Sequence, residues 1–127
     1  MQAGRTWNWV VLGAVCGFLG VGLGAFGAHG LEKVATEEGL AWWRTGVLYH
    51  LVHAPVLVLV GLLPLARPGR QAVGLAFLAG IGVFSGTLYA MALGAPRWLG
   101  AVTPLGGLAL LAGWAFLALA SRRPSGA

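Results

Sequence analysis

The chain has 127 residues, of which 58% are hydrophobic and only 9% are charged, and its mean hydropathy is +0.84. Soluble domains carry about 25% charged residues, so this composition excludes most of the chemistry open to a soluble protein and indicates one compact membrane domain. The net charge of +5 does not indicate nucleic-acid binding, because the basic residues are scattered singly near helix ends, where anionic lipid headgroups explain them.

Four long stretches contain no Asp, Glu, Lys or Arg, and together they cover most of the chain. A hydrocarbon core of about 30 Å needs about 20 helical residues. We therefore predict an all-α, integral membrane four-helix bundle that forms a single domain over residues 1–127, with helices at about 7–28, 37–66, 71–94 and 103–120. The uncharged stretches are Trp9–Ala28, Val47–Ala66, Gln71–Pro96 and Trp98–Ala120.

The first stretch has a rival interpretation as a signal peptide. Arg5 precedes it, and Ala25-Phe26-Gly27 resembles a small-residue cleavage site. We treat the stretch as a permanent helix.

The distribution of basic residues predicts the orientation in the membrane. Four spans place both termini on one side, and that side carries five basic residues against three on the other. The positive-inside rule therefore predicts that both termini are cytoplasmic. The five are Arg5, Arg67, Arg70, Arg122 and Arg123, and the three are Lys33, Arg44 and Arg97.

Five tryptophans are expected to form aromatic belts at the two membrane surfaces, as amphipathic rings do. Trp7 and Trp9 fall at the inner interface, and Trp42, Trp43 and Trp98 fall at the outer one.

The second helix is expected to begin before the membrane. Thr36 can cap it, and Glu37 and Glu38 then lie in the first turn, where the helix dipole favours anions. Pro55 removes one backbone donor inside this helix and predicts a kink.

Proline and glycine predict the connections that follow. Pro64 and the segment Arg67-Pro68-Gly69-Arg70 are expected to form a short inner turn. Thr103 and Pro104 are expected to be the N-cap and the first residue of the fourth helix. This leaves Gly94–Val102 as an outer hairpin loop.

Glycines recur at helical spacing in the first and third helices. In lipid, small residues drive association because they let helix backbones approach closely. Packing within one bundle is our main interpretation, and packing between subunits is the alternative. The glycines are Gly13, Gly17, Gly20, Gly24 and Gly27 in the first helix and Gly82 and Gly86 in the third.

Polar side chains gather in the outer half of the predicted bundle and are expected to line one outward-facing pocket. Ionisable residues inside a membrane commonly mark functional sites, so we treat these residues as candidates for one. His53 would be the proton-accepting or ligand-binding centre, with Tyr49 and Tyr89 as its hydrogen-bond partners. The alternative is that these groups only bond across helices and hold them together. The candidates are His29, Tyr49, His53, Ser85, Tyr89 and Thr103.

The sequence offers weak candidates for metal binding in His29, His50 and His53. Neutral imidazoles at positions i and i+3 suit zinc or copper, but no third ligand is fixed by spacing. We therefore predict no metal and no other cofactor. No Ser-His-acid set is apparent either, because every acid lies in one short loop, so we expect no enzymatic activity. The alternative is a metal-dependent or redox enzyme at the outer face, built on His29 and His53.

Three separated segments carry a family resemblance. They are Gly24–Leu31, Thr45–Ala54 and Phe84–Tyr89, and the last continues through Leu99–Gly107 to Gly113-Trp114. They resemble the YgdD-like family of small four-helix membrane proteins, which is also called domain of unknown function 423 or transmembrane protein 256-like.

The family pattern carries over to all six residues of the candidate pocket. This chain departs from it at His50, where the family usually has an amide residue, and at Val52, where it tends to have tyrosine. The resemblance implies a protein of the bacterial plasma membrane and implies no established biochemical activity. The matching positions are His29, Tyr49, His53, Ser85, Tyr89, Thr103 and Pro104.

Together, these features favour a non-enzymatic scaffold or accessory protein that acts through helix packing. Its expected partners are the lipid bilayer and a second copy or another membrane protein, with no nucleic acid. The alternative is a transporter, or a protein that binds a small ligand or lipid in the polar pocket around His53.

Overall fold

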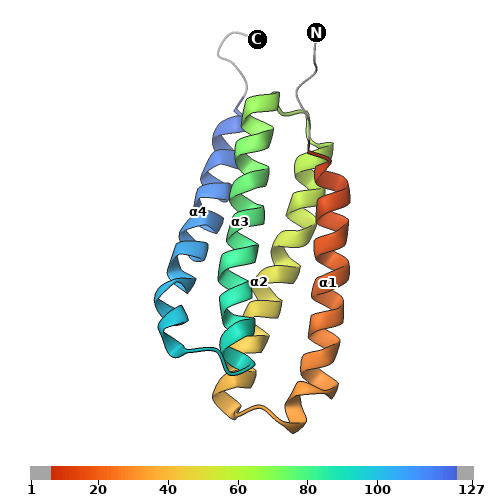
Figure 1. The fold of residues 1–127 in the computed structure, drawn as a ribbon. Coiled ribbons are helices and arrows are strands. Elements are labelled where there is room, and N and C mark those ends of the chain that lie inside the picture. Colours follow the sequence, from red (N-terminus) through yellow and green to blue (C-terminus); the bar gives the residue numbers. More distant parts are fainter. Residues whose placement is uncertain (1–6, 123–127) are drawn as a thin grey trace.

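A computed structural model describes residues 7–122 and contains four long helices and two short 3₁₀ helices in that range (Figure 1). All four long helices are long and apolar enough to cross a membrane, which confirms the prediction of an all-α protein with four candidate membrane spans. Two of the basic residues counted above, Arg5 and Arg123, lie outside the described residues. The elements are α1 (Trp9–His29), η1 (Leu31–Lys33), α2 (Glu37–Leu62), α3 (Arg67–Ala92), η2 (Arg97–Ala101) and α4 (Thr103–Ala120).

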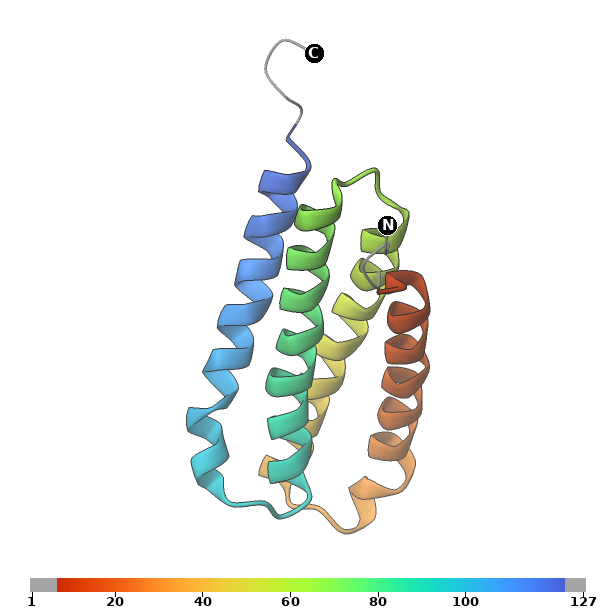
Figure 2. The ribbon, with the colours of Figure 1, turned by 45° about the horizontal axis from the view of Figure 1, so that its top comes forward.

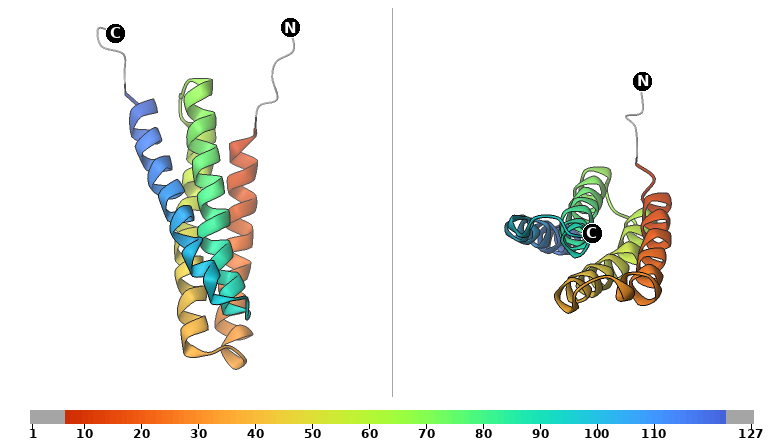
Figure 3. Two further views of the ribbon diagram at one scale, coloured as in Figure 1. Left: turned by 60° about the vertical axis from the view of Figure 1, so that its left-hand side comes forward. Right: turned by 60° about the horizontal axis from the view of Figure 1, so that its bottom comes forward.

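The helices pack as a bent row in chain order. Extensive contacts join α1 to α2, α2 to α3 and α3 to α4. The end-on view in Figure 3 shows α1 and α4 at opposite ends of this row. The outer helices α1 and α4 are consequently less buried than the central pair. Figure 2 shows that α1 begins and α4 ends at the end of the molecule that holds the α2–α3 connection.

The start of α2 follows the sequence prediction. The Thr36 side-chain oxygen accepts a hydrogen bond from the Gly39 amide at 3.0 Å, and Glu37 and Glu38 lie in the first turn. The helix is continuous through Pro55 and ends at Leu62. The predicted cap is therefore confirmed, while the predicted end at residue 66 is four residues too late.

The segment 67–70 forms the first turn of α3, so its prediction as a turn between helices is wrong. Pro68 lies at the start of the helix, where its missing amide hydrogen costs nothing because that donor has no partner within the helix. Arg70 donates a hydrogen bond from Nη2 to the carbonyl of Leu63 at 2.9 Å, which gives this carbonyl, just beyond α2, a partner. Only residues 63–66 connect the two helices.

Thr103 is the first residue of α4 rather than its cap, which Val102 provides. Its hydroxyl donates to the Leu99 carbonyl at 3.1 Å, one turn earlier in the chain. The predicted loop at 94–102 contains the short helix η2, and α3 ends at Ala92.

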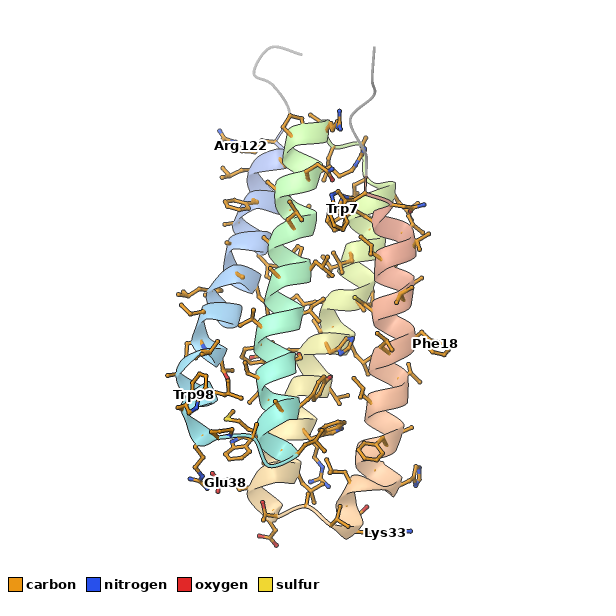
Figure 4. The ribbon with its side chains drawn as sticks, in the orientation of Figure 1. Trp7, Phe18, Lys33, Glu38, Trp98 and Arg122 are labelled. Carbon is orange, nitrogen blue, oxygen red and sulfur yellow. The ribbon has the colours of Figure 1, made fainter. Side chains whose placement is uncertain are left out.

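Two of the predicted belt tryptophans lie inside the molecule. Trp9 is 1% exposed and Trp43 is 2% exposed. The Trp43 indole donates to the Leu23 carbonyl of α1 at 2.8 Å, across the space that Gly27 leaves. Trp7 and Trp98 are exposed toward opposite ends of the molecule, as belt residues are expected to be (Figure 4).

The glycine seam on α1 faces α2. An added Cβ at Gly13 would lie 2.6 Å from the backbone nitrogen of Val58, and one at Gly27 would lie 2.5 Å from Cδ1 of Trp43. Gly20 is held equally close to α2, whereas Gly17 and Gly24 leave more room. The seam thus brings the two backbones together within one chain.

Candidate functional site

His50 connects three helices from a buried position near the middle of α2. Its Nε2 lies 2.7 Å from the carbonyl oxygen of Cys16 in α1, and its Nδ1 lies 2.9 Å from the hydroxyl of Tyr89 in α3. A carbonyl can only accept a hydrogen bond, so Nε2 carries the hydrogen. In the neutral ring, Nδ1 then accepts from the Tyr89 hydroxyl. This arrangement uses both ring nitrogens.

The glycine seam gives His50 its access to the α1 backbone. A Cβ added at Gly20 would lie 3.2 Å from Cδ2 of His50, within the space that the imidazole needs. Gly20 is one turn after Cys16, whose carbonyl receives the hydrogen bond. The seam therefore serves two purposes, because it packs the helices and exposes a backbone acceptor to a side chain of α2.

His53 makes a separate connection, from α2 to α4. Its Nδ1 lies 2.7 Å from the carbonyl oxygen of Tyr49, and its Nε2 lies 3.1 Å from the indole nitrogen of Trp114. An indole N–H can only donate, so Nε2 accepts and Nδ1 donates to the carbonyl. The geometry specifies a neutral ring with its hydrogen on Nδ1, and neither nitrogen is left for a proton or a ligand.

The predicted partners of His53 are only partly correct. The Tyr49 ring stacks on the imidazole, with ring centroids 6.1 Å apart. Tyr89 bonds to His50 instead, so its assignment to His53 is wrong. The two histidines also bond to different neighbouring helices, although they are three residues apart in α2.

The hydroxyl residues of the predicted pocket make further bonds between helices. Ser85 donates to the Gly46 carbonyl of α2 at 2.7 Å and is almost fully buried. The hydroxyls of Thr87 and Thr103 lie 2.6 Å apart and join α3 to α4. These contacts match the alternative interpretation in which polar side chains hold the helices together.

The predicted single pocket is replaced by two separate groups of polar residues, one around His50 and one around His53. A cleft of about 590 Å³ lies beside His53 between α2 and α4, and its walls are largely apolar. Of the six predicted pocket residues, only Tyr49 and His53 line this cleft. His29 is exposed at the end of α1.

The candidate metal ligands are not brought together. Within residues 7–122, no group of three or more His, Cys, Asp or Glu side chains is close enough to hold a metal ion. The nitrogens of His50 and His53 are both engaged in hydrogen bonds, as described above.

Two contributors to these bonds escaped prediction. The indole of Trp114 is not among the predicted site residues, and its partner His53 lies 61 residues away in the chain. The carbonyl of Cys16 belongs to the backbone, and no residue type marks such an acceptor. The glycine spacing on α1 was the one available signal, because it indicates where a backbone can be reached.

The fold and the bonding of its polar residues define a small helical membrane protein whose buried polar groups join one helix to another. Residues 23–107 match the family model described as a protein of unknown function, DUF423. The chain belongs to this family of membrane proteins, which is also named UPF0382, as the sequence resemblance indicated.

Relatives of similar length occur in bacteria and in a fungus. The UPF0382 membrane protein YwdK of Bacillus subtilis is 44% identical over 115 residues, which cover 88% of this chain and 94% of the relative. A UPF0382 membrane protein of Haemophilus influenzae is 38% identical, with 90% and 93% covered. One from Schizosaccharomyces pombe is 39% identical, with 86% and 94% covered. No solved structure matches the chain.

Proposed function

We propose that the protein is a non-enzymatic scaffold or accessory protein that packs one face of α3 against a transmembrane helix of another chain. The observation that supports this proposal is an open glycine face. An added Cβ at Gly82 or Gly86 would meet no atom within 4 Å, so these two glycines do not contribute to packing within the chain.

The open face of α3 has the composition of a helix-packing surface. Ala79, Gly82 and Gly86 follow one another at spacings of three and four residues, so they share one side of the helix. Leu75, one helical turn before Ala79, is also exposed. Close backbone approach at small residues is what drives helix association in lipid, where no hydrophobic force acts between helices.

The bonding of the histidines favours this proposal over transport or catalysis. A proton carrier or nucleophile activator needs a ring nitrogen that can exchange its partner. Both nitrogens of His50 and of His53 are instead bonded to groups on the helices around them. The transporter and ligand-binding alternative around His53 therefore has less support.

The proposed contact can be tested by crosslinking from the open face of α3 and by substitution of a glycine on that face. A photo-crosslinking amino acid replaces Ala79, and crosslinked products are separated from native membranes. We expect a product larger than the monomer, at the mass of a dimer or of a complex with another protein. Gly86→Ile should reduce its yield about tenfold, which corresponds to about 1.4 kcal/mol of association free energy.

Gly22→Ile is the matched control, because a Cβ at Gly22 in α1 also meets no atom within 4 Å. It should leave the crosslinking yield unchanged. Equal yields in Gly86→Ile and Gly22→Ile, or a monomer alone in every sample, would contradict the proposal.

We further propose that the protein lies in a bacterial plasma membrane with both termini on the cytoplasmic side. Arg122 and Lys33 lie at opposite ends of the molecule (Figure 4). By sequence, the side that four spans assign to both termini has five basic residues, against three on the other side. Alkaline phosphatase fused after Ala127 should be inactive, whereas insertion after Ala35 should give an active enzyme. The reverse pattern would overturn the orientation.

A further inference from the structure

A cleft of about 510 Å³ lies between α1 and α2 at the end of the molecule that carries η1. Small residues of α1 form one wall, and Gly24 and Gly27 come closest to α2 there. Trp43 and Val47 line the α2 side. The lining of the cleft is thus mostly apolar, and both helices contribute to it.

Two side chains of opposite charge line the same cleft. Glu32 comes from η1 and Arg44 comes from α2, and both are exposed. Neither side chain forms an ion pair or hydrogen bond with any group in residues 7–122. By contrast, Glu38 and Arg97 on the same end of the molecule do form an ion pair. The cleft therefore presents one unpaired anion and one unpaired cation above an apolar surface.

The apolar surface continues from this cleft toward the other end of the molecule. A second cleft of about 590 Å³ runs between Gly17 of α1 and Val58 of α2, and Leu51 lines both clefts. From Arg44 to Val58, α2 rises about 21 Å at about 1.5 Å per residue. One leaflet of hydrocarbon is about 15 Å thick, so the groove is long enough for an acyl chain.

We propose that this α1–α2 groove binds a phospholipid whose headgroup combines a phosphate with a primary ammonium, as in phosphatidylethanolamine. The Arg44 guanidinium donates to the phosphate oxygens, a geometry for which arginine is well suited. The Glu32 carboxylate accepts hydrogen bonds from the ammonium. One acyl chain lies along the groove toward Leu51. The site involves α1, η1 and α2, so it does not depend on the α3 face proposed above.

The charge pair predicts a definite order among lipids with the same acyl chains. Phosphatidylglycerol has the phosphate but no ammonium, so nothing in its headgroup offsets the negative charge of the Glu32 carboxylate. Phosphatidylcholine has the same charges as phosphatidylethanolamine, but its trimethylated nitrogen has no hydrogen to donate. The ethanolamine lipid is therefore the best match of the three.

Native mass spectrometry of the full chain in mild detergent tests this site directly. The protein is titrated with each of the three lipids, and the bound fraction is measured. We expect phosphatidylethanolamine to bind about three to five times more strongly than phosphatidylglycerol, which is the effect of about one exposed ion pair. Glu32→Gln should remove this preference, and Arg44→Gln should weaken the binding of both lipids.

Lys33→Gln is the control, because Lys33 adjoins Glu32 in η1 without lining the cleft. It should preserve the preference for phosphatidylethanolamine. Ala28→Trp places a ring into the open cleft beside Gly27 and should reduce the binding of every lipid. Stronger binding of phosphatidylglycerol by the unmodified chain, or an unchanged preference in Glu32→Gln, would overturn the proposal. Full lipid binding by Ala28→Trp would also overturn it.

Discussion

Replacing Gly106 with leucine is expected to force α4 away from α3 and to lower the free energy of unfolding by about 3 kcal/mol, the upper end of the range for overpacking. An added Cβ at Gly106 would collide with the backbone nitrogen of Phe84 and would lie 2.7 Å from its Cα. A backbone cannot move aside as a flexible side chain can, so the two helices must separate. Unfolding by sodium dodecyl sulfate in mixed micelles measures this loss.

Gly82→Leu is the control, because it makes the same glycine-to-leucine change in the neighbouring helix α3. A Cβ at Gly82 meets no atom within 4 Å, and Gly82 lies on α3 beside Phe84. Its free energy of unfolding in detergent should stay within about 0.5 kcal/mol of the unmodified protein. Equal destabilisation by Gly106→Leu and Gly82→Leu would show that the close α3–α4 approach at Gly106 does not limit stability.

Replacing His50 with leucine is expected to lower the free energy of unfolding by about 2 kcal/mol. The substitution removes two hydrogen bonds and leaves the Cys16 carbonyl and the Tyr89 hydroxyl without those partners. Hydrogen bonds between transmembrane helices contribute about 0.6 to 2 kcal/mol each. The same mixed-micelle unfolding experiment measures the effect.

His50→Gln separates the loss of bonding from the loss of the imidazole ring. An amide offers both a donor and an acceptor, so glutamine can donate to the Cys16 carbonyl and accept from Tyr89. We expect it to recover about half of the stability lost in His50→Leu. Equal stability of His50→Leu and the unmodified chain would show that these bonds contribute nothing.

The membrane spans and the α2 cap could be predicted because local sequence determines them. An uncharged stretch of about 20 residues has few alternatives to a membrane helix. Thr36 followed by two acids specifies a helix start through contacts within four residues of the chain. The segment 67–70 was ambiguous, because a Pro-Gly pair between two arginines is typical both of a turn and of a first helical turn.

The partners of the polar side chains could not be predicted, because they depend on distant backbone atoms. Ser85, His50 and Trp43 all donate to carbonyls of neighbouring helices, and no residue type identifies those acceptors. Helical spacing shows which residues share a face but not which helix they meet. For this reason six candidates were assigned to one pocket, whereas the structure places them in separate contacts.

The buried tryptophans were misplaced for a related reason. An aromatic residue near a helix end is typical of a membrane belt, and Trp43 has that position in α2. Its ring turns inward because Gly27 on α1 has no side chain to occupy the same space. A prediction that pairs large residues with glycines on neighbouring helices requires the helix order and register, which the sequence pattern alone does not supply.

The most direct test of the bonded histidines is nitrogen-15 nuclear magnetic resonance of histidine-labelled protein in lipid bilayers at neutral pH. We expect two neutral buried rings, with the hydrogen of His50 on Nε2 and that of His53 on Nδ1, as the contacts with Cys16 and Trp114 require. A charged imidazolium at either position, or a His53 hydrogen on Nε2, would contradict these contacts. Either result would mean that a ring nitrogen is available to bind a proton or a ligand, and it would favour the transporter alternative.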